Sequence, residues 1–260
     1  VGGLAALYAA FGSPIDLMGH YMFTFHMLSM ALGYMAAAPM LLAGVPDWLF
    51  RRFADVPAAR LVRWAVHPFP ALVLFNLLFS LYHFPKVHDY IMTHYAVHVL
   101  YYVALMVTAW TMWYPVLCPL PERDRLLGLR KMFYLFGNSL LLMPACALII
   151  FSNTPMYGTY NDPLQWAVAM GFCIPQGAQF VLENFPGPHA LQWTDALTDQ
   201  RTGGLVMKMI QEAVYGGALV YVFRQWYRTE NPKRRDGERD PLEPTPAYYE
   251  MVRARAEPQH

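Results

Sequence analysis

Charged side chains are scarce in this 260-residue chain, where Asp, Glu, Lys and Arg together make up 14% of the residues. An average soluble domain carries roughly 25%. Hydrophobic residues make up 56% of the chain, and this balance excludes an ordinary soluble globule. The formal net charge is only +1, with the basic residues confined to loops and the C-terminal tail, so no nucleic-acid partner is predicted.

Cysteine is also rare, and its positions exclude several kinds of site. Cys118, Cys146 and Cys173 share no C-x-x-C spacing, which argues against a disulfide scaffold, a thioredoxin-like redox pair and a zinc ribbon. The apolar segments contain no nucleophile motif and no pair of carboxylates of the kind that hydrolysis uses. We therefore do not expect an enzyme.

Long apolar blocks are abundant, and five of them can cross a bilayer, for which about 20 apolar residues suffice. They cover residues 20–44, 66–83, 90–114, 132–152 and 204–223. Residues 1–11 read as the end of a further span whose beginning is missing. The sequence predicts an all-α, polytopic transmembrane helix bundle over residues 1–230, followed by a partly disordered tail over 231–260, where charges and prolines cluster.

The basic residues indicate how the bundle is oriented. Four lie in residues 45–65, four in 115–131 and eight from residue 224 onward, which together are 16 of the 19. The positive-inside rule makes that side, and the tail, cytoplasmic. A crossing at 163–182 would put the tail outside, and Pro175, Gly177 and two glutamines interrupt it. We therefore predict an interfacial or re-entrant segment within an outer loop, 152–203.

Histidines gather at the opposite, outer face of the predicted bundle. Ionisable residues inside spans are costly and are by default functional candidates. His67 falls at a cytoplasmic helix end, and His260 is the last residue. The other seven of the nine fall at or near the outer face: His20, His26, His83, His88, His94, His98 and His189. This clustering is the strongest functional signal in the chain.

The spacing of these residues predicts a metal site. Residues four apart share a helix face, which places His26 with Met30, and His94 with His98 and Tyr102. Imidazole and thioether together favour copper, especially Cu(I), over the oxygen-preferring metals, and thioethers do not argue for zinc. We predict His26, Met30, His94 and His98 as ligands, joined by His20 or His83. The alternative is that methionines pack the core and histidines sit at the interface, which we prefer for His67 and leave open for His88 and His189.

Several long segments resemble one known family. They are GSPIDLMGHYMFTFHMLSM (12–30), AAPMLLAGVPDWL (37–49), LYHFPKVHDYIMTHYAVH (81–98), MWYPVLCPLPE (112–122), MPACALIIFSNTPMYGTYNDP (143–163) and DQRTGGLVMKMIQEAVYG (199–216). In this order they resemble the CtaG family of Gram-positive bacteria, membrane proteins needed to make an active caa3-type cytochrome c oxidase. That family is distinct from the similarly named single-span copper chaperone of proteobacteria.

The resemblance implies a seven-helix protein of the bacterial cell membrane, whose first helix and most of the second are absent here. It also implies delivery of copper to the oxidase catalytic subunit, at its copper B centre. Distant members carry His in place of Met30 and Tyr102. The ligand set here would therefore be softer than theirs, and Tyr102 is expected to lie beside the ligands rather than among them. By the same resemblance, Asp199 belongs near the histidines, where a carboxylate can orient an imidazole.

Two other functions and one assembly question stay open at this stage. A copper permease would need further ligands in the cytoplasmic half, where only His67 and Cys118 stand out. A haem-binding cytochrome would need facing histidines on neighbouring helices, for which His83 with His94 or His98 would serve. A homodimer sharing one site is a further alternative.

Overall fold

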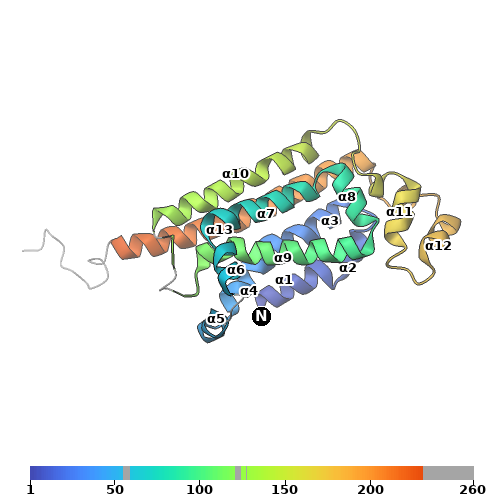
Figure 1. Cartoon of the computed structure of the whole chain (residues 1–260). Helices are drawn as coiled ribbons and strands as arrows, with labels where there is room; N and C mark the ends of the chain where they lie inside the picture. The colour runs from blue at the N-terminus through green and yellow to red at the C-terminus, as the bar shows by residue number, and fades with distance from the viewer. Residues whose placement is uncertain (55–58, 121–123, 127, 231–260) are drawn as a thin grey trace, which may run out of the picture.

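The computed structural model describes residues 1–54, 59–120, 124–126 and 128–230, and its regular secondary structure is entirely helical there (Figure 1). The N-terminal elements are α1 (Gly2–Phe11), α2 (Pro14–Met18), α3 (Phe23–Met30), the π-helix η1 (Ala31–Ala37), α4 (Ala38–Gly44), α5 (Asp47–Ala54) and α6 (Ala59–Ala65). They are followed by α7 (Pro68–Tyr82), α8 (Pro85–Met92), α9 (Tyr95–Leu117), α10 (Leu129–Phe151), the 3-10 helix η3 (Gly158–Tyr160), α11 (Pro163–Met170), α12 (Gly177–Asn184), the 3-10 helix η4 (Pro188–Ala190) and α13 (Ala196–Glu230).

Four helical stretches are long and apolar enough to cross a membrane: Phe23–Gly44, Tyr95–Leu117, Leu129–Phe151 and Ala196–Glu230. The number rises to five if α7 and α8, which bend by 81° at residues 83–84, count as one span. The predicted all-α, polytopic bundle is therefore confirmed. Two predicted spans had wrong boundaries. Residues 90–92 end α8, and the following span begins only at Tyr95. The last span covers Ala196–Glu230 and not only residues 204–223.

The bundle is held by close approach of α13 to its neighbours. A Cβ on Gly203 would lie 2.8 Å from a ring carbon of Phe23, and one on Gly204 would lie 2.7 Å from Ile149. Small residues let membrane helices approach in this way. A buried amide pair adds a polar link between α7 and α10, where Asn76 donates to Asn138 at 2.8 Å. These contacts join α13 to α3 and α10, and α10 to α7.

Helix α1 lies against the first complete span, mainly along η1 and α4. Ser29 of α3 donates a hydrogen bond to the Ala10 carbonyl at 2.6 Å, and the ring of Phe11 packs on Tyr34 with centroids 5.5 Å apart. The stretch that carries Tyr34 is π-helical and runs into Pro39. A proline offers no N–H to the preceding turn, which explains a local widening of the helix there.

The segment between α10 and α13 contains two short α-helices rather than a span. Helices α11 and α12 have eight residues each, which at 1.5 Å per residue is about 12 Å, far below the bilayer core. They enclose a small core of their own, made of Trp166, Ala167, Met170 and Val181. In Figure 1 they project beyond the ends of the long helices, on the side where α8 lies.

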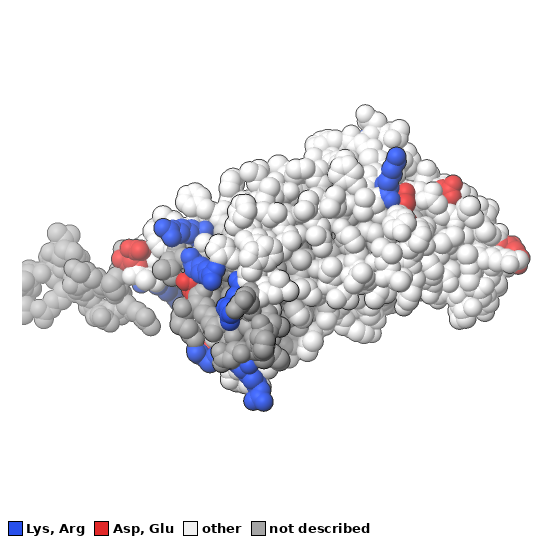
Figure 2. Space-filling view, in the orientation of Figure 1, with Lys and Arg blue, Asp and Glu red and all other residues white. Residues whose placement is uncertain are grey.

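Basic side chains collect at the other end of the bundle. Figure 2 shows blue side chains gathered there, with a broad uncharged surface covering most of the length. The described basic residues of this end include Arg51, Arg63, Arg125, Lys131 and Arg228. Away from it, Lys208 and Glu212 form the structural ion pair that their spacing predicts. The tail 231–260 lies outside the described residues.

Candidate metal centre

The centre of the histidine end is His26, whose position is fixed by α13. The carboxylate of Asp199 accepts the backbone N–H groups of Phe23 at 2.6 Å and Thr24 at 3.1 Å. It therefore caps the first turn of α3, where the free N–H groups and the helix dipole both favour a negative charge. His26 lies one turn further along the same helix and is buried.

Two tyrosines hold the ring of His26 from the side of α7 and α9. The Tyr82 hydroxyl is hydrogen-bonded to Nε2 of His26 at 3.0 Å, and the two rings stack. The same hydroxyl lies 3.3 Å from the Tyr102 hydroxyl and 3.6 Å from the sulfur of Met92. Tyr102 in turn meets the ring of His98 edge-on, with centroids 4.2 Å apart. This network links His26 to His98 across three helices.

His88 of α8 lies closest to His26 among the histidines, with ring centroids 5.3 Å apart. It is fully buried, and its Nδ1 faces the Thr159 hydroxyl at 3.4 Å and the Asp89 carboxylate at 3.5 Å. His20, His83 and His98 are also near enough to interact electrostatically with His26. Five histidines, from α3, the α7–α8 bend, α8, α9 and the loop before α3, thus share one end of the bundle.

The segment around η3 covers this cluster. Asp89 accepts the backbone N–H groups of Gly158 at 2.9 Å and Thr159 at 3.1 Å. The ring of Tyr157 packs on His88 at 4.7 Å, and its hydroxyl donates to the His83 carbonyl at 2.8 Å. On the other side, the Tyr160 hydroxyl donates to the carbonyl of Gly19 at 2.7 Å. The cluster is therefore closed from outside by aromatic rings that hydrogen bonds hold in place.

The hydrogen bonds of the histidines determine which ring nitrogen is available. His83 donates from Nδ1 to the Phe79 carbonyl at 2.6 Å, and His88 directs Nδ1 toward Asp89. A nitrogen that faces only an acceptor carries the proton, which leaves a lone pair on Nε2 of the neutral ring. The Nε2 atoms of His83, His88 and His98 are buried and have no hydrogen-bond partner among the described residues. Unpaired buried nitrogens are rare, and the Nε2 lone pairs of His83 and His88 could bind a metal ion.

A side pocket of about 430 Å³ opens beside the cluster, between α2, α9 and the loop that follows α11. The polar and sulfur-bearing side chains that line it include Asp16, His20, Met92, His98, Tyr102 and Cys173. His20 donates from Nδ1 to the Asp16 carbonyl at 2.9 Å. Burial lowers the pKa of His20, but its interactions with the Cys173 side chain and with Asp16 outweigh burial and raise it. Imidazole, thiol and thioether groups suit a soft metal.

The structure does not bring every predicted ligand to this place. His94 is the residue before α9, is exposed, stacks on Tyr90 at 4.1 Å and donates to the Tyr90 carbonyl. It does not line the pocket that His98 lines. Met30 is fully buried in the hydrophobic core, one turn deeper than His26. His67 lies at the opposite end of α7, and His189 is exposed in η4.

Two placements could not be read from sequence spacing. Asp199 caps α3 through its hydrogen bonds with Phe23 and Thr24, which places it beside the histidine end of the bundle. That it orients an imidazole, as the resemblance implies, stays a prediction. His88 follows the sharp bend after α7, and only that bend turns its side chain inward. Among the described residues, no group of three or more His, Cys, Asp or Glu side chains is spaced to hold a metal ion as it stands.

Comparison with known proteins identifies the family. The family model described as cytochrome c oxidase caa3 assembly factor (Caa3_CtaG) matches residues 1–229. No curated protein and no solved structure matches the chain.

Proposed function

The chain belongs to the cytochrome c oxidase caa3 assembly factor family, and we propose that its part in assembly is to carry Cu(I) to the catalytic subunit of the oxidase, for its copper B centre. The cargo would be held at the histidine end of the bundle, on the extracytoplasmic side of the bacterial cell membrane. The protein would act as a carrier and not as a catalyst.

The observation that carries this proposal is the set of three buried, unpartnered Nε2 atoms on His83, His88 and His98. A buried imidazole nitrogen without a partner costs free energy, about 1–3 kcal/mol for a polar group. Three of them at one end of one bundle are difficult to explain by packing alone. A metal that binds there would remove that cost, because the anchored Nδ1 atoms leave the Nε2 lone pairs available.

The side pocket supplies a route to the buried histidines. Cys173 is exposed where it lines this pocket, and the Nε2 atom of His98, which lines it too, is buried. Met92 and Tyr102 line the pocket and also contact the Tyr82 hydroxyl that occupies Nε2 of His26. Thiol and thioether groups along this path favour Cu(I) over Zn²⁺ and over oxygen-preferring ions. Copper would pass from sulfur ligands to imidazoles and return by the same path to the oxidase.

Copper binding at the cluster requires a small rearrangement. No three of the described histidine, cysteine and acidic side chains are spaced to hold an ion as they stand. The ion would therefore be held by two of these side chains together with a methionine thioether. Alternatively, Tyr82 would first release His26, which would then become a ligand. Few and exchangeable ligands suit a protein that must give its metal away. A rigid four-ligand cage is typical of sites that keep their metal.

The test compares two double variants that each remove two histidines from the full chain, in cells that make the oxidase. In His26→Gln/His88→Gln we expect oxidase that retains haem but lacks copper at its catalytic centre. In the control His67→Gln/His94→Gln, whose residues are exposed, we expect normal copper content. Equal copper content in oxidase from both variants would contradict the proposal. Copper uptake into protein-containing vesicles would instead favour a permease, and a Soret band from purified protein would favour a cytochrome.

A further inference from the structure

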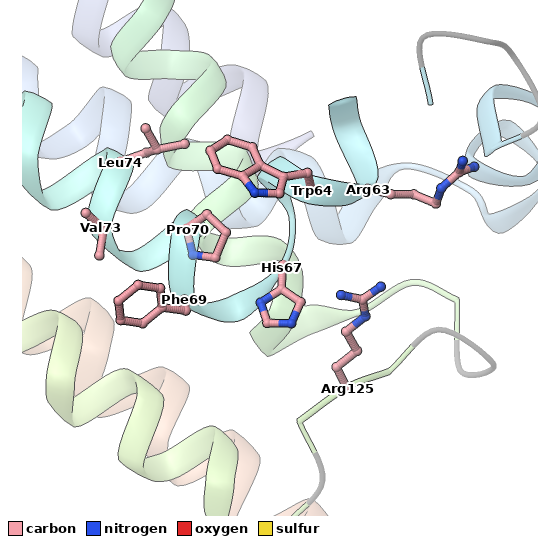
Figure 3. Close-up of a pocket in the computed structure, with 8 residues that line it drawn as sticks. All are labelled: Arg63, Trp64, His67, Phe69, Pro70, Val73, Leu74 and Arg125. Carbon is pink, nitrogen blue, oxygen red and sulfur yellow. The ribbon is translucent and has the colours of Figure 1, made fainter. Parts of the chain in front are cut away.

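One ion pair of the bundle lies far from both of its ends. Lys208 and Glu212 are the only Asp, Glu, Lys or Arg residues in the interior of the spans, taken as residues 23–44, 68–82, 95–117, 132–151 and 202–223. Arg63 and Arg125, by contrast, line a cavity at the end of the bundle where α7 begins (Figure 3). The copper proposal makes no use of the Lys208–Glu212 pair.

The depth of this pair follows from its contact with α10. The hydroxyl of Ser139 donates a hydrogen bond to Oε1 of Glu212 at 3.2 Å. Helix α10 has 23 residues, and at 1.5 Å per residue its length of about 34 Å is close to the thickness of the hydrocarbon core. Ser139 lies ten residues after the first residue of α10, Leu129, and twelve before the last, Phe151. The carboxylate of Glu212 therefore lies about halfway across the bilayer.

At this depth the carboxylate faces outward from the bundle. The side chain of Glu212 is 54% exposed, and only lipid would surround it in an isolated chain. Lys208 and Ser139 both contact Oε1, whereas Oε2 has no hydrogen-bond or ion-pair partner among the described residues. Lys208 balances the net charge, but hydrocarbon offers no donor to the second oxygen. Ionised groups within spans almost always face protein or water, so we expect another protein group to cover this one.

The surface around the carboxylate is apolar. Five exposed residues surround it: Leu205, Met209 and Leu219 of α13, and Phe136 and Met143 of α10. Those of α13 lie three or seven residues from Glu212, and those of α10 lie three or four from Ser139, which places each set on one helix face. We call this surface, with Lys208 and Glu212 at its centre, the α10–α13 face. Its partner must be apolar, with a polar group at the same depth.

We propose that the α10–α13 face binds the same face of a second copy of this chain, related by a two-fold axis normal to the membrane. Such an axis keeps both copies at one depth, and an isologous interface must be complementary to itself. The face meets this condition because it carries one ammonium and one carboxylate side by side. Lys208 has three N–H donors, so it can keep Glu212 of its own chain and also donate to Oε2 of Glu212 in the other copy.

A second copy also fits the charge balance better than a foreign helix that brings a cation. Such a helix would leave the cluster with a net positive charge in hydrocarbon, which is costly. Two copies bring two ammonium and two carboxylate groups together, and the cluster stays neutral. Polar contacts of this kind hold membrane helices together.

Photobleaching of labelled full chain in phosphatidylcholine vesicles, measured as the protein is diluted in lipid, tests the association. We expect the parent chain to pass from two-step to one-step bleaching as the protein-to-lipid ratio falls. Lys208→Met/Glu212→Leu replaces the ion pair by apolar side chains, a change that often preserves stability, and it should weaken association at least about tenfold. The control Arg224→Met/Glu230→Leu removes one charge of each sign near the last residue of the same helix and should associate as the parent does.

Cross-linking identifies the face that is in contact. In a Cys173→Ser background, which removes the exposed cysteine, a single cysteine replaces either Met209 of the α10–α13 face or Leu77 of α7, both exposed. Leu77 adjoins Asn76, which donates to Asn138 of α10, so both replaced positions lie near the middle of the bilayer. A membrane-permeant bifunctional thiol reagent should link Met209→Cys chains into dimers and leave Leu77→Cys chains single.

Three results would overturn the proposal. One-step bleaching of the parent chain at every protein-to-lipid ratio would show that no second copy covers the face. Equal association of the parent chain and Lys208→Met/Glu212→Leu would show that the ion pair takes no part in it. Equal cross-linking at residues 77 and 209 would place the contact elsewhere on the bundle.

Discussion

The carboxylate of Asp199 accepts the backbone N–H of Phe23 at 2.6 Å, across 176 positions of the chain. It thereby ties the start of α13 to the first turn of α3, three residues before His26. The hydroxyl of Thr24 returns a hydrogen bond to the Asp199 carbonyl at 3.0 Å. The geometry of the histidine cluster therefore depends on a residue that contributes no metal ligand.

Replacement of Asp199 should loosen this junction. Asp199→Ala leaves two buried N–H groups without a partner, and we expect a loss of about 2–4 kcal/mol in stability, seen as a lower midpoint of thermal unfolding in detergent. Asp162 caps α11 through the same two kinds of contact but is exposed. Asp162→Ala should cost less, about 1 kcal/mol. Equal effects of the two substitutions would contradict the role given to Asp199.

The close approach of α13 to α3 gives a second prediction. Gly203→Val places a Cβ where Phe23 and Met27 already lie within 2.8 to 3.1 Å, and overpacking of this kind typically costs about 1–3 kcal/mol. Gly216 lies on the same helix and has nothing within 4 Å of an added Cβ. Gly216→Val should unfold at nearly the temperature of the parent protein. A comparable loss in both variants would mean that helix propensity, and not packing, sets the effect.

Tyr82 is predicted to restrain His26. In Tyr82→Phe, Nε2 of His26 loses its 3.0 Å hydrogen bond, and Cu(I) affinity should rise about fivefold, since such a bond contributes about 1 kcal/mol. Tyr101 packs against Tyr82 but donates its hydroxyl hydrogen to the Leu78 carbonyl, so Tyr101→Phe is the matched control. Chelator competition measures both variants. Weaker binding in Tyr82→Phe would instead make the hydroxyl part of the binding site.

The cover formed by η3 should open when its anchor is removed. Asp89→Ala deletes the acceptor for the amides of Gly158 and Thr159, and hydrogen exchange at these two amides should become faster. Amides within α11 should keep the exchange rates of the parent protein, because their hydrogen bonds lie within that helix. Unchanged exchange at Gly158 and Thr159 would show that the aromatic contacts of Tyr157 and Tyr160 hold the cover by themselves.

Much of the fold follows from the sequence because bilayer thickness sets the length of apolar segments. That rule placed the ends of the first four spans to within about five residues, whereas α13 runs well beyond the predicted block 204–223 at both ends. The interruption by Pro175 and Gly177 argued against a span at 163–182, where α11 and α12 form. The length rule did not predict the bend between α7 and α8. The hydrophobic periodicity of a helix carries no information about an 81° turn, and the predicted span 90–114 therefore began too early.

The site was harder to derive than the fold because side-chain direction depends on tertiary contacts. The i, i+4 rule placed His94 beside His98, but His94 precedes the first turn of α9 and faces Tyr90. His88, which spacing left undecided, lies at the centre of the cluster. Asp199 caps α3 although the two are far apart in the sequence, so no local sequence pattern predicts this contact.

Cu(I) affinity of the purified full chain, measured by chelator competition, tests the central claim most directly. His26→Gln/His88→Gln removes two buried rings of the cluster, and His67→Gln/His94→Gln removes two exposed rings. The account predicts a loss of at least about tenfold in the first variant and the affinity of the parent protein in the second. Equal affinity in the two variants would contradict a metal site at the histidine end of the bundle.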